Sequence, residues 1–271
     1  MPNASPDQGK SGYDRSMAGP VQSIERAAAI LRLLAGGPRR LGLGEVASSL
    51  GLAKGTAHGI LRTLQHVDFV EQDEATGKYQ LGAALLHLGT SYLDVNELRS
   101  RSINWADALA ARSGEAVRLG TPLEGQVLVI HHVFRPDDTL QTLDVGALLP
   151  LHASSLGKVL LAFGAASLDP PSEDGLAAYT RHTLVTPEDI DRELAGIREL
   201  GWGAEVQEMS MGDAGIAAPI RGHGGLVVGA IGLSGPVERI CDPRGRPLPA
   251  LTALLREAAR AISRDLGAAR W

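Results

Sequence analysis

The sequence predicts an α+β protein with a small helical N-terminal domain, a two-stranded wing, and a larger domain with a mostly antiparallel sheet. Apolar residues recur at helical spacing between residues 21 and 66, and two short strand-like segments follow at 69–72 and 78–81. From residue 96 onward, strands and helices alternate, and glycine-containing turns separate the strands into hairpin-like pairs. A chain of 271 residues is long enough for two hydrophobic cores, so we expect two domains.

Composition narrows the class of protein before any motif is considered. Hydrophobic residues make up 44% and charged residues 21% of the chain, as in soluble globular proteins, and no apolar run approaches the roughly 18 residues of a membrane span. The N-terminus lacks the features of a secretory signal, so we expect a cytoplasmic protein with no membrane partner. Cys241 is the only cysteine, which excludes an internal disulfide framework and a multi-cysteine metal site.

The net charge of −5 is distributed unevenly. Residues 39–66 carry a local charge of +3, whereas residues 82–271 carry −6. Phosphate contacts depend on the local potential within about a Debye length, roughly 10 Å. An acidic chain with a basic N-terminal segment is therefore compatible with nucleic-acid binding, although chance asymmetry is the alternative.

The N-terminal segment begins with a stretch that lacks any hydrophobic period. Residues 1–20 are rich in Pro, Gly, Ser, Asp and Lys, so we expect a disordered tail. A first helix should follow, with Ser23 as its cap and its end at Gly36-Gly37-Pro38. The apolar face expected for this helix comprises Ile24, Ala27, Ala28, Leu31 and Leu34.

A helix-turn-helix is indicated between residues 43 and 66. A first helix over 43–50 and a second that opens near Ala53 are separated by the tight turn Gly51-Leu52. Each carries an apolar face, comprising Leu43, Val46, Ala47 and Leu50 in the first and Ala57, Ile60, Leu61 and Leu64 in the second. Packing of these faces frees the polar side of the second helix to lie in a major groove, and the wing completes a winged helix-turn-helix over residues 21–82.

The polar side of the second helix supplies candidate DNA contacts. Arg62 has the chemistry for a bidentate contact with a guanine edge, worth about 1–3 kcal/mol of discrimination, or for a phosphate contact. Gly55 and Gly59 each weaken the helix by about 1 kcal/mol relative to alanine, which suggests close approach of the backbone to a partner such as DNA. Solvated charges without a partner are the alternative. The residues expected at the interface are Lys54, Gly55, Thr56, His58, Gly59 and Arg62, with Arg40 and Lys78 as phosphate contacts.

Residues 83–95 are expected to form a linker helix. An apolar stripe runs along it and comprises Leu81, Leu85, Leu88, Tyr92 and Val95. A helix that joins two domains has little of its own chain to bury against, so the stripe favours a dimer contact over intrachain core.

The second domain is expected to span residues 96–268. Its helices are predicted at 97–113, at 155–163, at 187–200 behind Thr186 as a cap, and at 249–266. The strands are predicted at 117–122, 127–134, 139–145, 216–220 and 226–233. An α+β domain of this size is suited to enclosing a small molecule.

The chain resembles the IclR family of bacterial transcriptional regulators from Val21 to Leu266. The motifs that carry the resemblance fall in the family's order and are Ser23–Ala27, Gly51–Thr56, Gly77–Gly82, Pro150–Lys158, Gly212–Pro219 and Leu233–Pro236. The resemblance implies a GAF-like effector-binding domain, a homodimer or dimer of dimers, and a small metabolite that modulates binding to double-stranded operator DNA. Within the family, the runs 54–62 and 134–138 are similar to regulators of glycerol-utilisation operons, which makes glycerol or glycerol 3-phosphate the candidate effector.

The resemblance also implies which residues line the effector pocket. Matched by motif, they are Leu149, Ser155, Leu156, Glu205, Asp213, Gly215, Gly232 and Ser234. Many family members carry a cysteine where Gly215 stands and a serine where Gly232 stands. Both departures are expected to enlarge the pocket, which puts a carboxylate effector of the usual kind in doubt and leaves hydroxylated or phosphorylated ligands open. Glu205 and Asp213 as surface carboxylates, and Ser154 as a helix cap alone, are the alternatives.

Signatures of catalysis are weak. Gly157-Lys158 lacks the glycine spacing of a phosphate-binding loop, Gly232–Gly235 is one residue short of a nucleophile elbow, and His131 and His132 point to opposite faces of a strand. We therefore expect no catalytic residue, metal or cofactor. The sequence is interpreted as a ligand-responsive repressor of a carbon-utilisation operon. A second domain that only oligomerises, or a metabolite-processing enzyme with a DNA-binding domain, is the alternative.

Overall fold

A computed structural model of the chain describes residues 20–36, 38, 40–137, 139–168 and 175–269, and within its helices it leaves the side chains of 90–91 and 93–95 undescribed. The chain divides into two compact units, Met1–Ser91 and Tyr92–Trp271. The division falls inside the expected linker helix 83–95. Apart from Pro20, the tail expected over residues 1–20 lies outside the described residues.

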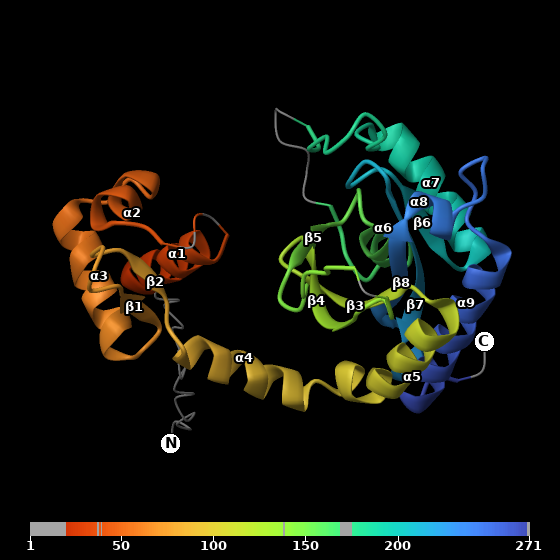
Figure 1. The fold of residues 1–271 in the computed structure, drawn as a ribbon, viewed down its shortest axis with the longest axis horizontal. Coiled ribbons are helices and arrows are strands. Elements are labelled where there is room, and N and C mark those ends of the chain that lie inside the picture. Colours follow the sequence, from red (N-terminus) through yellow and green to blue (C-terminus); the bar gives the residue numbers. More distant parts are fainter. Residues whose placement is uncertain (1–19, 37, 39, 138, 169–174, 270–271) are drawn as a thin grey trace, which may run out of the picture. The chain divides into compact units, whose positions relative to one another are not determined.

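The first unit is a three-helix core with a wing (Figure 1). Its elements are α1 (Gln22–Gly36), α2 (Leu43–Ser49), α3 (Lys54–His66), β1 (Val70–Gln72) and β2 (Tyr79–Leu81). Leu41 adds an isolated bridge to Tyr79, so the wing is joined to the segment before α2. The winged helix-turn-helix expected from the sequence is therefore present.

Glycine allows two close turns in this unit. Gly51 adopts a φ of 61° between α2 and α3, a left-handed conformation that glycine takes without steric cost. At Gly82, after the wing, an added Cβ would lie 2.2 Å from the carbonyl oxygen of Asp68. The backbone at residue 82 can lie this close to the backbone of Asp68 only because residue 82 has no side chain.

The apolar face predicted for the first helix is partly wrong. Ile24 is 66% exposed, whereas Ala27, Leu31 and Leu34 contribute to the core as expected, together with Ile30, which was not part of the predicted face. Ser23 lies inside the first turn rather than at the cap position, because α1 already begins at Gln22. The run of alanines at 27–29 widens the apolar face of the helix, and the side that contacts α2 and α3 includes Ile30 but not Ile24.

The second unit is a six-stranded antiparallel sheet covered by helices on both faces, in the strand order β5-β4-β3-β8-β7-β6. Its strands are β3 (Ala116–Leu123), β4 (Gln126–Val133), β5 (Leu148–Pro150), β6 (Gly203–Val206), β7 (Asp213–Arg221) and β8 (Val227–Pro236). The helices are α5 (Glu97–Ser113), α6 (Ser155–Ala162), α7 (Pro187–Leu200), α8 (Val237–Ile240) and α9 (Pro249–Asp265), preceded by α4 (Ala84–Val95), which contains the boundary between the units. The expected α+β class is confirmed.

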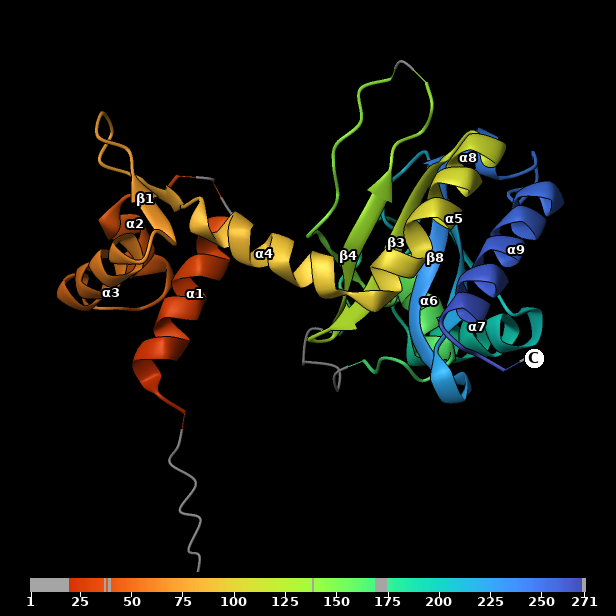
Figure 2. The ribbon, with the colours of Figure 1, turned by 90° about the horizontal axis from the view of Figure 1, so that it is seen from below.

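The two faces of this sheet have separate cores. Helices α5 and α9 lie side by side over one face (Figure 2), where Leu119, Ile216 and Leu255 are buried together. Helices α6 and α7 cover the other face, where Val159 and Ile197 are buried. Of the helices in the described part of the chain, none is both long and apolar enough to cross a lipid bilayer.

The third strand expected at 139–145 is wrong, since the strand in this region is β5. The segment before β5 is held instead by the backbone N–H of Asp144, which donates to His132 Nδ1, and by that of Gly146, which donates to the carbonyl of Val129. Strand β6 and helix α8 were not predicted. Strand β6 contains Gly203 and Ala204 and only one β-branched residue, so its composition gives little strand signal.

Candidate DNA-binding surface and effector pocket

The polar residues of α3 lie on one exposed face of the helix. Ala57, Leu61 and Leu64 are buried in the core of the first unit, which fixes the rotation of α3 about its axis. The opposite side presents the six predicted positions, of which Thr56 is half-buried and the others are exposed: Lys54, Gly55, Thr56, His58, Gly59 and Arg62. Among the described residues, neither Lys54 nor Arg62 takes part in an ion pair. Both cations are thus available to an anionic partner.

Arg40 and Lys78 differ from the residues of α3 because both have acidic neighbours. Arg40 Nη1 lies 2.8 Å from Asp73 Oδ2 in the wing turn, and Lys78 Nζ lies 4.0 Å from Glu45 Oε2 at the start of α2. The same carboxyl group of Asp73 accepts hydrogen bonds from the backbone N–H groups of Ala75 and Thr76. Each of these two cations is therefore partly neutralised by a carboxylate before any contact with a phosphate.

Strand register explains why a pocket opens beside α6. Glu205, Gly215 and Ser234 pair in a row across β6, β7 and β8, and the row two residues along contains Gly232 beside Arg118. A Cβ added at Gly215 would lie 3.0 Å from Ser155 Oγ, so these rows face the start of α6. Small residues in the sheet leave space there that larger side chains would fill.

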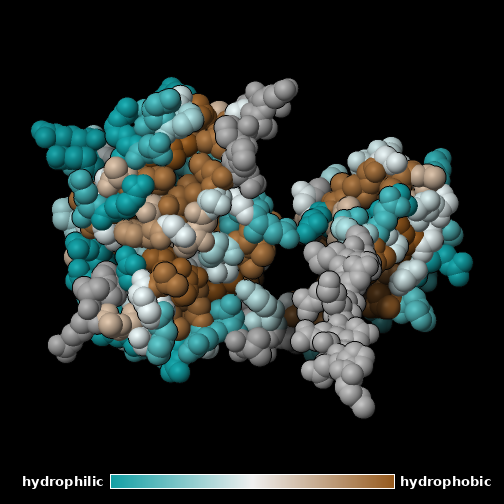
Figure 3. All heavy atoms as spheres, turned by 180° about the vertical axis from the view of Figure 1, so that it is seen from behind, coloured by the Kyte–Doolittle hydropathy of each residue, from teal (hydrophilic) through white to brown (hydrophobic). Residues whose placement is uncertain are grey.

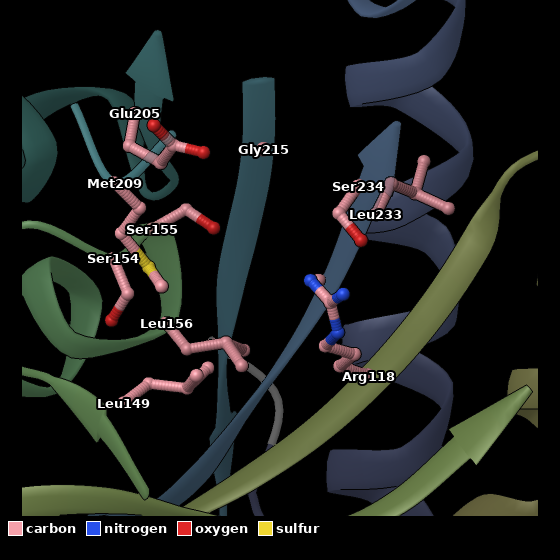
Figure 4. Close-up of a pocket in the computed structure, with 11 residues that line it drawn as sticks. Arg118, Leu149, Ser154, Ser155, Leu156, Glu205, Met209, Gly215, Leu233 and Ser234 are labelled. Atoms are coloured by element: carbon pink, nitrogen blue, oxygen red, sulfur yellow. The ribbon is translucent and has the colours of Figure 1, made fainter. Parts of the chain in front are cut away.

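The pocket is a depression partly open to solvent, with about 320 Å³ of space between its atoms when the open solvent is counted. It is lined by Arg118, Leu149, Ser154, Ser155, Leu156, Glu205, Met209, Gly215, Gly232, Leu233 and Ser234. Seven of the eight residues expected from the family resemblance are among these, and Asp213 lies in a neighbouring hollow instead. Figure 4 shows Glu205, Met209 and Ser155 on one side of the pocket, with Arg118 and Ser234 on the other.

Two features of the pocket differ from the sequence-based expectation. A Cβ at Gly232 would lie 2.9 Å from the carbonyl oxygen of Ile216 and 3.3 Å from Leu156 Cδ2, so this glycine also permits a close approach of the backbone. Arg118 was not predicted as a pocket residue. The alternation of side chains along β3 could have indicated its position. Val117 and Leu119 are buried on one face of the sheet, so Arg118 between them is directed toward α6 on the other face.

Glu205 is a buried acid with little compensation for its charge. Its Oε2 accepts a hydrogen bond of 3.0 Å from the backbone N–H of Glu208. Burial raises the pKa of Glu205 to about 7, and the nearby Glu208 carboxylate adds to this effect. The group can therefore act as a hydrogen-bond donor or acceptor near neutral pH.

Lys158 binds strand β6, which carries Glu205, and the residue Glu208 that follows it. This buried lysine donates to Glu208 Oε1 at 2.6 Å, to the carbonyl oxygen of Ala204 at 3.1 Å and to Glu193 Oε1 at 3.3 Å. Its charge is thus directed mainly at Glu208 and Glu193, and no cation among the described residues forms a hydrogen bond with Glu205. Burial raises the pKa of Glu208 as well, and Lys158 opposes that shift.

The three serines of the pocket have different roles. Ser154 caps α6, because its Oγ accepts from the backbone N–H of Gly157 and donates to the carbonyl oxygen of Pro150, in agreement with the cap alternative. Ser234 Oγ is buried without a hydrogen-bond partner among the described residues, and Ser155 makes no side-chain hydrogen bond there either. Ser155 and Ser234 are consequently free to bind a ligand.

Comparison with known proteins places both units in one family. Residues 23–74 match the model of the IclR helix-turn-helix domain, and residues 90–264 match that of the C-terminal domain of the bacterial transcriptional regulator IclR. The chain is 55% identical over 255 residues to the glycerol operon regulatory protein of Streptomyces coelicolor, a match that covers 94% of this chain and all of that relative. The protein of the same name from Streptomyces griseus is 52% identical with the same coverage.

A solved structure shows the same fold. The IclR transcriptional regulator from Alicyclobacillus acidocaldarius is 27% identical and superimposes with a TM-score of 0.76, covering 90% of this chain and 98% of that one. Both the order of the two domains and the architecture of the second are thereby shared with this relative.

Proposed function

The chain belongs to the IclR family of bacterial transcriptional regulators, and we propose that it represses an operon for glycerol utilisation in response to a small metabolite. The observation that carries this proposal is the 55% identity to a glycerol operon regulatory protein over that relative's whole length. The free cations on α3 and the polar pocket beside α6 supply the two binding sites that such a regulator needs. It would act in the cytoplasm, where bacterial operators lie, by regulation rather than catalysis.

For DNA recognition, we assign residues 21–82 to operator binding. Helix α3 would enter the major groove with Lys54, Gly55, Thr56, His58, Gly59 and Arg62, while Arg40 and Lys78 would contact phosphates. A homodimer or dimer of dimers would place two such helices on the half-sites of a palindrome. Double-stranded operator DNA is thus the proposed macromolecular partner.

For effector recognition, we assign residues 96–268 to the effector-binding domain, with residues 83–95 as the linker helix. Glycerol or glycerol 3-phosphate would bind in the pocket formed by α6 and the sheet, next to Glu205, Ser155 and Ser234. The effector must bind two arrangements of the paired DNA-binding domains with unequal affinity, because equal affinity would leave operator binding unchanged.

Footprinting tests the whole proposal. The protein is incubated with the region upstream of its own gene and with neighbouring promoters, with and without glycerol and glycerol 3-phosphate. We expect a protected palindrome that weakens or shifts with one of the two compounds. Protection that neither compound alters would contradict the glycerol assignment alone. Absence of protection at every salt concentration would contradict operator binding.

The variant Arg62→Ala tests the recognition helix. Loss of one base or phosphate contact should weaken operator binding roughly tenfold to a hundredfold. The thermal midpoint should remain nearly unchanged, since Arg62 is exposed and takes part in no ion pair among the described residues. Arg244→Ala, at an exposed loop position of the second unit, is the matched control. Operator affinity equal to wild type would remove Arg62 from the interface.

A further inference from the structure

We propose that the effector is a small hydroxylated anion that lies across the pocket, with its anionic group at Arg118 and its hydroxyl groups at Glu205 and Ser155. This inference rests on the proposed function in one respect, namely that the effector binds in this pocket. It adds the charge, the orientation and the principal binding residue of the ligand.

Arg118 has unused hydrogen-bonding capacity at the pocket. Its Nε donates to Asp144 Oδ2 at 2.7 Å, and neither Nη atom makes a hydrogen bond to any described residue. In Figure 4 the guanidinium group points toward Ser234, whose Oγ is buried without a partner. The free Nη groups can therefore bind a carboxylate or phosphate as a planar fork.

A second hollow continues the pocket on the Arg118 side. It is open to solvent, with about 660 Å³ of space when the open solvent is counted, and Arg118 and Ser234 line both it and the pocket. His132 also lines it, with a side chain only 2% exposed. The Nδ1 atom of His132 accepts from the backbone N–H of Asp144, so Nε2 carries the proton, and this buried N–H has no partner among the described residues. A second unsatisfied donor thus lies beside Arg118.

The other charged residues of the hollow do not occupy the space beside the free Nη atoms of Arg118. Arg135 also lines the hollow, but it is bound to Asp137 and Thr139. The Asp213 side chain belongs to an exposed residue at the start of β7. Asp144 is the carboxylate that already occupies one edge of the Arg118 guanidinium, so an anionic ligand would share or replace that ion pair.

The opposite side of the pocket is unfavourable for an anion. Glu205 faces it there, and burial already raises the pKa of this carboxyl group to about 7 because the site gives a negative charge little support. Hydroxyl groups suit this position, since they can both donate to and accept from Glu205 and Ser155. The pocket is therefore polarised, with the anion at Arg118 and hydroxyls at Glu205.

Calorimetric titration of the full-length protein with glycerol, glycerol 3-phosphate and glycerate tests this orientation. Wild type should bind at least one of the two anions roughly tenfold or more tightly than glycerol. The preference between phosphate and carboxylate distinguishes the two possible sources of the anion. In Arg118→Gln, the affinity for that anion should fall roughly tenfold or more, while the weak binding of glycerol should stay within about twofold.

Two further variants separate ligand binding from fold stability. Asp144→Asn breaks the same ion pair as Arg118→Gln but frees the guanidinium, so it should tighten anion binding. Arg246→Gln, which loses a surface ion pair with Asp242, should leave all affinities unchanged. Loss of anion affinity in Asp144→Asn, equal binding of glycerol and the anions, or no binding of any of the three would each overturn the proposal. An intact operator footprint alongside such a result would leave DNA binding by the regulator unaffected.

Discussion

Glu205 should make the stability of the second unit depend on pH. Burial raises its pKa from an ordinary 4.5 to about 7, so the folded state retains a proton that the unfolded state has released between these values. The free energy of unfolding therefore decreases as the pH rises through this window. In Glu205→Gln this contribution is removed, and the variant should be more stable than wild type at pH 8 by at most roughly 3 kcal/mol. Urea unfolding at pH 5, 6, 7 and 8 measures the difference.

The control for this prediction is Glu199→Gln, an exposed position on α7 that should leave the pH profile unchanged. A Glu205→Gln profile parallel to that of wild type would show that Glu205 is ionised throughout this range in the folded protein.

The pocket residues also show what a sequence can reveal at this scale. Glu205, Gly215 and Ser234 were identified by family motif, and strand register brings them into one row. Arg118 has no motif and was missed, because its place in the pocket depends on β3 lying beside β8, more than 100 residues away in the chain. Asp213 was placed in the pocket, but it lies two register positions from Gly215 along β7, in the neighbouring hollow.

Among the elements, α3 tolerates glycine at an exposed position where alanine would be more stable. A Cβ added at Gly59 meets nothing within 4 Å, so Gly59→Ala should stabilise the first unit by about 1 kcal/mol. If the backbone of α3 approaches DNA closely, the same methyl group should weaken operator binding roughly tenfold, equivalent to about 1.4 kcal/mol. Thermal unfolding and a gel-shift titration measure the two effects.

Gly196→Ala is the matched control for this prediction. Gly196 lies within α7, and a Cβ there also meets nothing within 4 Å. This variant should gain similar stability without any loss of operator affinity. Unchanged operator binding in Gly59→Ala would show that the helix keeps its distance from the groove at that position.

Secondary structure was predictable where the local signals agreed. Helix α7 begins and ends at the expected residues because Thr186 caps it and Gly201 ends it with a φ of 75°. The strand prediction for 139–145 was wrong because the segment is rich in Leu, Thr and Val, whereas the backbone N–H of Asp144 donates to His132 and that of the adjacent Gly146 to Val129, which holds the segment as a loop. Strand β6 was not predicted for the opposite reason. Its residues have little intrinsic strand preference, and its pairing with β7 stabilises the extended conformation.

At the scale of the whole molecule, hydrophobic side chains that remain in water need an explanation. Figure 3 shows brown residues among the hydrophilic surface of each unit on the face that it displays. On α4, Leu88 is 52% and Tyr92 48% exposed, and the two lie one helical turn apart. Leu81 is also exposed, whereas the side chain of Val95 lies outside the described residues. These exposed residues are consistent with the proposal that the stripe is a contact between copies of this chain.

Leu88→Asp tests that contact. A carboxylate at the centre of the stripe would be buried without a partner in a dimer, so the variant should sediment as a monomer at concentrations where wild type is dimeric or larger. Operator affinity should fall with it, because a monomer binds only one half-site of a palindrome. Leu226→Asp places the same charge at an exposed leucine between β7 and β8 and should leave both properties unchanged. Circular dichroism checks that each variant is folded. A folded Leu88→Asp protein that still sediments with the wild-type mass would place the dimer contact elsewhere, and α4 would then serve only to connect the two units.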